Sequence, residues 1–195
     1  MQALILNSGV GSRMGSLTRE RHKSMVEIAA GLPLIIYQIS TLAMVGVTDF
    51  IITTGYMQNK LINLVEKHFG NKCKFEFVFN PKYQTTNYIY SIFLAIDKIK
   101  GDLFLLHGDL FFTKEILEGL LNREQSAVVV DNLLLGSKKD FKAIVYEERV
   151  MKIATNICNP ASVSCQPLYK LKKVDWSIWA EAIQNFCYKG KTNVY

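Results

Sequence analysis

Residues 3–25 read ALILNSGVGSRMGSLTRERHKSM, in which an apolar run leads directly into glycines and then into basic residues. The run from Ala3 to Leu6 is continuously apolar, a pattern typical of a parallel strand buried on both faces. Gly9 and Gly11 permit a tight turn whose backbone N–H groups can approach a phosphate closely. This stretch therefore predicts a strand that leads into a phosphate-binding loop.

The composition is that of one globular domain. The chain has 195 residues, of which 49% are hydrophobic, and this length is sufficient to bury a core of its own. No apolar run approaches the ~20 residues that span a membrane, and the start lacks the features of a signal peptide, so we expect a cytoplasmic protein without a membrane partner. The 4 cysteines form no C-x-x-C pair, which favours reduced thiols over a zinc site.

The net charge of +6 is consistent with a polyanionic partner. Lys and Arg neutralise the phosphates of nucleic acids, anionic membranes and small substrates alike, so the charge does not choose among them. Aromatic residues do not alternate with basic ones in a stripe, which disfavours RNA binding. We therefore expect small-molecule substrates and no nucleic acid.

Strands and helices alternate through the first part of the chain. Apolar runs predict strands at residues 3–6, 50–54, 75–79 and 102–106. Apolar residues at helical spacing predict helices between them, the first from Pro33 to Gly46 and the others over 61–68 and 89–96. The polar segment 12–23 is expected to be a loop over a site. This alternation predicts an α/β fold with a Rossmann-like, mostly parallel sheet and helices on both faces.

Beyond residue 115 the pattern changes. Strand-like segments at 127–130, 143–146 and 150–153 follow one another without long helices, which predicts an antiparallel C-terminal extension. A last helix is expected where Trp179, Ile183 and Phe186 share one face, with Trp179 in the core and Asp175 as the N-cap. Because no linker or repeat divides the chain, we expect a single domain over 1–195, with a nucleotide-binding half at about 1–112 and an acceptor-binding half at about 113–195.

Two classes of protein place a glycine-rich turn after a first strand. A dinucleotide-binding oxidoreductase needs a helix that begins at the turn and an acidic residue after the second strand. Here no helical pattern follows Gly11, and the second strand ends in Thr53-Thr54-Gly55-Tyr56, so an NAD(P)-dependent oxidoreductase is the weaker alternative. A loop for a free triphosphate needs glycines, backbone N–H groups and cations. These are provided by Gly9, Gly11, Ser12, Arg13 and Lys23.

The stretch from Leu6 to Arg13, followed by Leu17-Thr18 and Lys23, resembles the G-x-G-T/S-R…L-T…P-K signature of the sugar-phosphate and small-alcohol nucleotidyltransferases. The resemblance covers about residues 1–112 and extends more loosely to residue 195. It implies a fold like that of the nucleotide-diphospho-sugar transferases. Further landmarks of the family occur in the same order: Pro33-Leu34-Ile35, Thr54-Gly55-Tyr56, Asn80-Pro81 with Asn87 and Ser91, and Gly108-Asp109.

The segment after Asn80 is most similar to cytidylyltransferases of the phosphocholine type and to those that act on phosphoglutamine in capsule synthesis. The resemblance thus implies Mg²⁺-dependent transfer of CMP from CTP to a small phosphorylated acceptor, such as phosphoglutamine or phosphocholine. Pyrophosphate would be released, and the product would serve capsule or cell-surface polysaccharide modification. A sugar-1-phosphate nucleotidyltransferase is a further alternative, and a homodimer is the assembly we consider.

The resemblance also assigns roles to individual residues. It gives Arg13 to the leaving pyrophosphate, Lys23 to the α-phosphate and the incoming oxyanion, and Asp109 to Mg²⁺. Tyr56 could equally be a packing residue, and Asn87 could also cap a helix. The nucleotide is expected to contact Leu6, Asn7, Ser8, Gly9, Gly11, Ser12, Arg13, Lys23, Gly55, Tyr56, Asn87 and Ser91.

Some positions depart from the family pattern or have no assigned role. His107 is interpreted as a strand-end histidine, because an acceptor phosphate is already ionised and needs no base. Ser164, Gln166 and Tyr169 are the candidates for the acceptor pocket. His22 stands where the signature has proline. The family's second metal-binding carboxylate is not found, so we expect the chain to continue past residue 195; the alternative is a catalytically inactive nucleotide-binding module.

Overall fold

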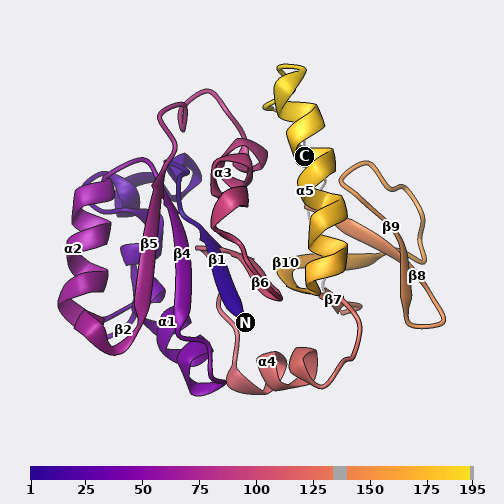
Figure 1. Ribbon diagram of the computed structural model, residues 1–195, viewed down its shortest axis with the longest axis horizontal. Helices are drawn as coiled ribbons and strands as arrows, with labels where there is room; N and C mark the ends of the chain where they lie inside the picture. Colours follow the sequence, from indigo (N-terminus) through magenta and orange to yellow (C-terminus); the bar gives the residue numbers. More distant parts are fainter. Residues whose placement is uncertain (134–139, 194–195) are drawn as a thin grey trace.

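The computed structural model of the protein describes residues 1–133 and 140–193, and it describes Ser12 and Arg13 by their backbone only. Within these residues, eight strands form one sheet in the order β5-β4-β1-β6-β10-β8-β9, with β7 paired to β10 (Figure 1). The strands are β1 (Gln2–Leu6), β4 (Asp49–Thr54), β5 (Lys74–Phe79), β6 (Leu103–His107), β7 (Ala127–Asp131), β8 (Lys142–Tyr146), β9 (Arg149–Ala154) and β10 (Val163–Leu171).

Strand β1 lies at the centre of the parallel part of the sheet. It pairs in parallel with β4 on one side and β6 on the other, and β4 pairs in parallel with β5. The predicted parallel sheet is thereby confirmed. The register places Thr53 and His107 beside Leu6, so these strands end at one edge of the sheet. The loops that follow them meet at that edge, where open α/β sheets bind ligands.

Helices cover both faces of the sheet, as the sequence predicts (Figure 1). The helices α1 (Leu34–Met44), α2 (Gln58–Phe69) and α4 (Lys114–Leu121) pack on one face, and α3 (Tyr88–Ala95) and α5 (Lys173–Tyr188) pack on the other. Within β1, Ala3 and Ile5 belong to the first core, whereas Leu4 and Leu6 belong to the second. Both faces of β1 are therefore buried, which explains its continuously apolar sequence.

The C-terminal extension is antiparallel, as predicted. Strand β10 pairs antiparallel with β6, β7 and β8, and β8 pairs antiparallel with β9. The sequence pattern indicated neither β10 nor α4. In β10 an irregularity between Cys165 and Tyr169 interrupts the apolar alternation, and Pro167 is unusual inside a strand. Helix α4 spans 8 residues, which is too short for a helical period to stand out.

The segment 12–23, predicted to be a loop, contains short 3-10 helices. The first, η1, covers Ser12–Thr18 and is kinked at Gly15, and the second, η2, covers Lys23–Met25. Such helices have little apolar periodicity, so the sequence pattern did not indicate them. Two more, η3 (Gly70–Lys72) and η4 (Ile96–Lys98), extend α2 and α3. A hairpin of β2 (Glu27–Ala29) and β3 (Leu32–Pro33) precedes α1.

The start of α5 differs from the prediction. Asp175 is not its N-cap; it lies in the first turn, and its carboxylate accepts a hydrogen bond from Ser126. The helix begins earlier because Asp102, immediately before β6, accepts a hydrogen bond from the Lys173 backbone N–H at 2.9 Å. The buried face of α5 carries Trp176, Ala180 and Ile183, whereas Trp179 is 37% exposed. The prediction that Trp179 lies in the core was therefore wrong.

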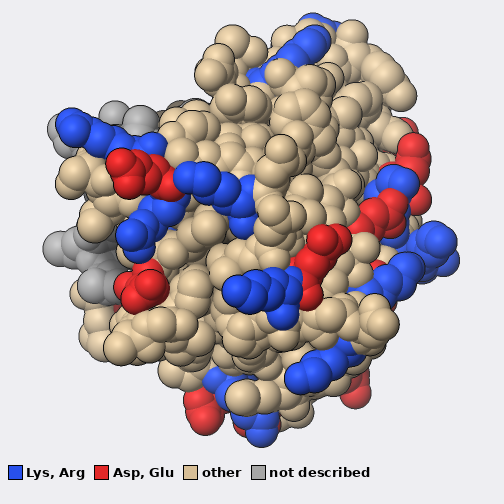
Figure 2. All heavy atoms as spheres, turned by 90° about the vertical axis from the view of Figure 1, so that its left-hand side faces the viewer, with Lys and Arg blue, Asp and Glu red and all other residues tan. Residues whose placement is uncertain are grey.

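The surface shows no separation of charge on the face that carries α2 and β5. Figure 2 shows basic and acidic side chains interspersed there rather than gathered in one basic stripe. Within the described ranges, no helix is long and apolar enough to cross a membrane.

Candidate active site

A cleft of about 560 Å³ lies at the carboxyl edge of the parallel strands, between them and β10. Its first wall comes from the loops after β1, β5 and β6, and its second wall comes from the segment before β8 and the middle of β10. The first wall contains Leu6, Ser8, Gly9, Lys23, Asn80, Tyr83, Thr86, Asn87, Tyr88, Ser91, His107 and Asp109. The second wall contains Asp140, Phe141, Ser164, Cys165, Gln166 and Pro167.

Lys23 and Asp109 form an ion pair in this cleft. The Lys23 ammonium nitrogen lies 2.9 Å from Asp109 Oδ2, and the lysine side chain is largely buried while the aspartate is 40% exposed. Burial of Asp109 opposes its ionisation, but the charge of Lys23 and the hydrogen bond it donates outweigh burial, so the pKa of Asp109 lies below its usual value. A cation and an ionised carboxylate therefore stand side by side where the predicted phosphates would bind.

His22 connects the glycine turn to the start of η2. Its Nε2 lies 3.1 Å from the Gly9 carbonyl oxygen, and its Nδ1 lies 3.2 Å from the Ser24 backbone nitrogen. Burial and the charge of Lys23 lower the pKa of His22 to about 4. The neutral ring can thus accept the Ser24 N–H bond at Nδ1 and donate from Nε2 to Gly9. Proline at position 22 could make neither side-chain contact.

The rest of the glycine-rich segment is held by backbone and side-chain contacts. Gly11 has a φ of 73°, and a Cβ at this position would lie 3.0 Å from Lys23 Cβ, so glycine is required where the two segments meet. Thr18 Oγ1 donates to the Gly11 carbonyl at 3.1 Å. Ser12 and Arg13 begin η1, and their side chains lie outside the described part of the structure.

Tyr56 and Gly55 follow β4 but do not line the cleft. The Tyr56 hydroxyl donates to the Arg19 carbonyl at 3.0 Å, and Lys60 Nζ donates to the Glu20 carbonyl at 3.0 Å. These contacts tie the segment after η1 to the start of α2. A Cβ at Gly55 would lie 2.5 Å from the Ser8 carbonyl oxygen, so the backbones of the two loops touch there.

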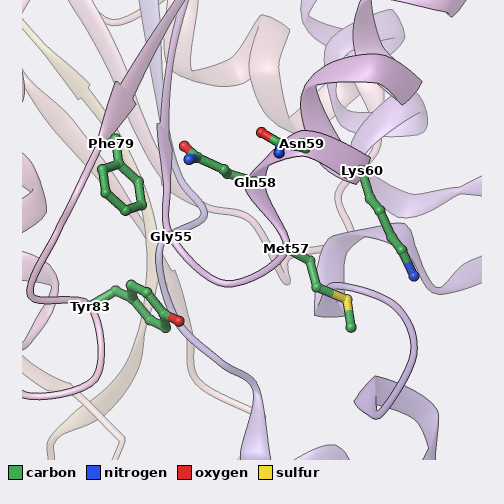
Figure 3. Close-up of a pocket in the computed structure, with 7 residues that line it drawn as sticks. All are labelled: Gly55, Met57, Gln58, Asn59, Lys60, Phe79 and Tyr83. Carbon is green, nitrogen blue, oxygen red and sulfur yellow. The ribbon is translucent and has the colours of Figure 1, made fainter.

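A smaller pocket of about 320 Å³ lies on the other side of this contact. Figure 3 shows Phe79 and Tyr83 together on one side of it, with Met57 and Lys60 on the opposite side. Tyr83 lines both this pocket and the main cleft. The pocket is lined by Gly55, Met57, Gln58, Asn59, Lys60, Phe79 and Tyr83.

Ser8, Ser91 and Asn80 form a hydrogen-bonded chain in the first wall. Asn80 Nδ2 lies 3.0 Å from Ser91 Oγ, which in turn lies 3.0 Å from Ser8 Oγ. Asn87 caps α3, because its side chain accepts from the Tyr88 backbone N–H at 2.8 Å. Its structural role is thus confirmed, and it also lines the cleft.

Asn7 does not line the cleft. Its side chain is fully buried, and neither its Oδ1 nor its Nδ2 has a hydrogen-bond partner among the described residues. A Cβ on Gly108 would lie 1.8 Å from Asn7 Oδ1, so the amide packs directly against this glycine. The backbone N–H of Asn7 donates to Thr53 Oγ1 at 3.1 Å. Asn7 and Gly108 therefore set how closely the ends of β1 and β6 approach.

The acceptor-side candidates separate into two groups. Ser164 and Gln166 line the cleft. Tyr169 does not; it packs against Trp179 with ring centroids 5.6 Å apart, and burial raises the pKa of its hydroxyl. Cys165 lies in the cleft wall, and burial raises the pKa of its thiol to about 11, so it is a poor nucleophile.

Some lining residues were not singled out from the sequence. Thr86, Asp140, Phe141 and Pro167 line the cleft, although no local motif indicates them. His107 lies at the end of β6, where burial lowers its pKa to about 4. Its ring is therefore neutral near pH 7, in agreement with its interpretation as a strand-end residue.

The donor set at the cleft is suited to Mg²⁺. No group of three or more His, Cys, Asp or Glu side chains that could hold a metal occurs among the described residues. Mg²⁺, however, usually binds one or two carboxylates and completes its octahedron with substrate phosphates and water. The ionised and partly exposed Asp109, beside a glycine-rich phosphate loop, fits that requirement.

Comparison with known proteins identifies the family. Residues 2–143 match the nucleotidyl transferase family model, and the chain belongs to that family. It is 33% identical over 139 residues to CTP:phosphoglutamine cytidylyltransferase of Campylobacter jejuni, and the match covers 67% of this chain and 53% of the relative. It is 32% identical over 123 residues to choline-phosphate cytidylyltransferase of Streptococcus pneumoniae, which covers 63% and 51%. The chain thus spans about half the length of these relatives.

A third relative is the CMP-5'-(3-aminopropyl)phosphonate synthase of Streptomyces rubellomurinus, 31% identical over 129 residues that cover 66% of this chain and 20% of the relative. Among solved structures, CTP:phosphocholine cytidylyltransferase from Streptococcus pneumoniae matches with a TM-score of 0.77 at 21% identity, over 100% of this chain and 81% of that chain. The inositol-1-phosphate CTP transferase from T. maritima matches with a TM-score of 0.75 at 24% identity, over 91% and 72%. These likenesses confirm the predicted fold.

Proposed function

We propose that this chain carries the active site of a Mg²⁺-dependent cytidylyltransferase, which transfers CMP from CTP to a small phosphorylated acceptor and releases pyrophosphate. The observation that carries the proposal is the pair of Lys23 and Asp109 at the centre of a cleft whose two walls come from the two halves of the chain. The use of CTP and of a phosphorylated acceptor is supported by the family and by the activities for which the relatives are named.

In this proposal an oxygen of the acceptor phosphate attacks the α-phosphorus of CTP. The new P–O bond forms as the bond to the bridging oxygen of the β-phosphate breaks, and pyrophosphate leaves with the electron pair. Such transfers depend on positioning and on neutralisation of charge rather than on covalent chemistry. Lys23 neutralises the α-phosphate and the incoming oxygen. The acceptor is already ionised, so the neutral His107 has no proton to remove.

The other parts of the first wall bind the nucleotide. Backbone N–H groups of the turn at Gly9 and Gly11 face the phosphates, and Arg13 interacts with the leaving pyrophosphate. Asp109 would hold Mg²⁺, which would supply positive charge that neutralises the leaving group. When the nucleotide binds, Lys23 exchanges its contact with Asp109 for one with the α-phosphate.

The acceptor binds against the second wall, where Ser164 and Gln166 face the cleft from β10. Phosphoglutamine, phosphocholine and similar small phosphate esters or amides are the acceptors we propose, in line with the relatives of similar sequence. The homodimer and the role in polysaccharide modification stay predictions.

Pyrophosphate release tests the proposed function. The full-length protein is incubated with Mg²⁺ and each of CTP, UTP, ATP and GTP, against phosphoglutamine, phosphocholine, phosphoethanolamine, aminoethylphosphonate and sugar 1-phosphates. We expect release with CTP and one of the first four acceptors, and loss of release when EDTA is added. Release with sugar 1-phosphates alone would favour the sugar-1-phosphate alternative. CTP binding without release from any pair would favour an inactive nucleotide-binding module.

A further inference from the structure

The turn that carries Asp109 is fixed on one side by the sheet. Asp109 lies just after β6, and its place in the cleft depends on the backbone on both sides of it. On the N-terminal side, His107 ends β6, where it pairs with Leu6 of β1. The next residue, Gly108, donates its backbone N–H to the Leu6 carbonyl oxygen at 3.1 Å. The chain therefore enters the turn from a fixed point.

On the other side of Asp109 the backbone is held by a side chain of α1. Gln38 is fully buried, and its Nε2 donates to the His107 carbonyl oxygen at 3.0 Å and to the Leu110 carbonyl oxygen at 2.8 Å. An amide nitrogen has two hydrogens, so each carbonyl receives one. Within the turn itself, the hydrogen bond from the Leu110 N–H to the His107 carbonyl is long, at 3.4 Å. Gln38 thus closes the turn by joining the residues on its two sides.

The Gln38 amide makes these bonds at a cost to stability. Its Oε1 is buried and has no hydrogen-bond partner among the described residues. The opposite orientation of the amide would place this oxygen against two carbonyl oxygens, so the positions of donor and acceptor are determined. A buried acceptor without a partner is unfavourable, and an apolar side chain at this position would not contain one. What the glutamine adds is the pair of hydrogen bonds to the turn.

A second residue of α1 holds the chain beyond the turn. The Tyr37 hydroxyl donates to the Phe112 carbonyl oxygen at 2.8 Å, and the Tyr37 ring stacks on Phe111 with ring centroids 4.8 Å apart. These contacts begin two residues after Asp109. Gln38, by contrast, contacts the residue that directly follows Asp109.

We propose that Gln38 is a positioning residue for Asp109, because its amide holds the turn in the form that places the carboxylate in the cleft, 2.9 Å from Lys23. This inference rests on the proposed function. Gln38 does not line the cleft, so it acts through the backbone of the turn. Because Mg²⁺ demands near-ideal octahedral geometry, a small displacement of the carboxylate weakens the site. Groups that orient a metal ligand typically change metal affinity or activity by about 10- to 100-fold when they are removed.

Two variants remove the donors and leave an uncharged side chain. Gln38→Met keeps the length of the side chain and Gln38→Leu is shorter, so agreement between them excludes an effect of volume alone. We expect each to lower kcat for pyrophosphate release by about tenfold or more, with the KM for CTP within about threefold of the wild type. In calorimetry, the gain in CTP affinity on addition of Mg²⁺ should fall at least about fivefold, while the affinity without Mg²⁺ stays unchanged.

The turn is also measured in the protein without nucleotide or metal. Hydrogen exchange of the Leu110 backbone amide, followed by NMR, should be at least about tenfold faster in both variants, because the turn opens more readily when Gln38 no longer joins its two sides. Exchange of the amides in the middle of β1 should be unchanged.

Thr41→Val is the matched control. Thr41 is a buried residue of the same helix, and its hydroxyl donates to the Tyr37 carbonyl oxygen at 2.8 Å instead of to the turn. Valine has nearly the same shape and loses this hydrogen bond. We expect kcat, the effect of Mg²⁺ and the exchange of Leu110 to remain as in the wild type. Thermal unfolding verifies that each variant is folded.

A double variant tests whether Gln38 acts through Asp109. If it does, Gln38→Met should have little further effect on kcat in a protein that already carries Asp109→Asn, because the carboxylate that it positions is gone. Effects of the two substitutions that multiply independently would overturn the proposal.

The outcomes separate this inference from the proposed function. If the wild type neither binds CTP nor releases pyrophosphate, the proposed function fails, and the role of Gln38 in the reaction fails with it. If the wild type is active and both Gln38 variants keep its kcat and its Mg²⁺ dependence, the positioning role alone is overturned. Unchanged exchange of Leu110 in the variants would also overturn it, since Gln38 would then not hold the turn.

Discussion

Lys23 and Asp109 are separated by 86 residues in the sequence, yet their charged atoms lie 2.9 Å apart in the cleft. Lys23 is positioned by η2 and by His22, and Asp109 follows the end of β6. Each charge is balanced by the other in the absence of substrate. In the proposed reaction the triphosphate and Mg²⁺ take over as their partners.

Lys23→Ala should reduce turnover more than nucleotide affinity. The ammonium acts mainly on charge that develops as the α-phosphorus is attacked, so we expect kcat to fall by a factor on the order of hundreds and CTP affinity to stay within about tenfold. Steady-state pyrophosphate release and calorimetry measure the two effects. Lys67→Ala, on the exposed side of α2, is the control and should change neither. Unchanged turnover in Lys23→Ala would remove this lysine from the mechanism.

Asp109→Asn should remove the effect of Mg²⁺ on nucleotide binding. Asparagine keeps the shape of the side chain but loses the negative charge that Mg²⁺ prefers. Calorimetric titration with CTP, with and without Mg²⁺, should show a large metal effect in the wild type and little in the variant. Asp97→Asn, an exposed position after α3, should behave as the wild type. Equal CTP affinity of the wild type with and without Mg²⁺ would contradict the metal assignment.

His22 should make the free energy of unfolding depend on pH. Its pKa is about 4 in the folded protein against 6.5 for an ordinary histidine. As the pH falls below about 6.5, His22 takes up a proton in the unfolded chain, whereas in the folded protein it does so only near pH 4. The free energy of unfolding is therefore highest above about pH 6.5. It falls by roughly 3 kcal/mol between about pH 6.5 and pH 4.

His22→Gln removes the titrating group while an amide N–H can still donate to Gly9. Urea unfolding at about pH 5 and pH 7 should show a difference in stability that is smaller by roughly 2 kcal/mol than in the wild type. His68→Gln, at an exposed histidine of α2, should keep the wild-type difference. Because burial also lowers the pKa of His107, part of the pH dependence should remain in His22→Gln. A difference between pH 5 and pH 7 that is as large in His22→Gln as in the wild type would show that His22 does not contribute.

Asn7 and Gly108 should behave as a coupled pair. Gly108 does not have a positive φ, so alanine is tolerated by the backbone, but its Cβ would collide with the Asn7 amide. We expect Gly108→Ala to destabilise the protein by about 1–3 kcal/mol. Asn7→Ala removes both the collision and an unpartnered buried amide, so the double variant should regain most of this loss. Additive single effects in urea unfolding would exclude the contact.

Much of the fold could be predicted because local pattern and tertiary environment agree. The continuously apolar Ala3–Leu6 is buried on both faces of the sheet, and Pro33 immediately precedes α1. The Asn87 cap was also recognisable from sequence, since it is a contact within one turn. The start of α5 could not be found in this way, because it is set by Asp102, which lies about 70 residues away in the sequence.

The candidate site could be predicted where its residues belong to a sequence motif. The glycine turn, Lys23 and Asp109 belong to a family signature with fixed spacing, and the structure brings them together. Tyr56 contacts the backbone of Arg19 and does not line the cleft. This depends on the path of segment 12–23, which the sequence pattern does not predict.

The fate of the α-phosphate of CTP distinguishes cytidylyl transfer from the other reactions of a nucleoside triphosphate. The full-length protein is incubated with Mg²⁺, the preferred acceptor and CTP that is radiolabelled at the α-phosphate, and the products are separated by chromatography. Cytidylyl transfer predicts that the label enters a CDP derivative of the acceptor in equal amount to the pyrophosphate released. Label recovered as CDP with a phosphorylated product, or as CMP without an acceptor adduct, would show that the protein does not transfer CMP to the acceptor.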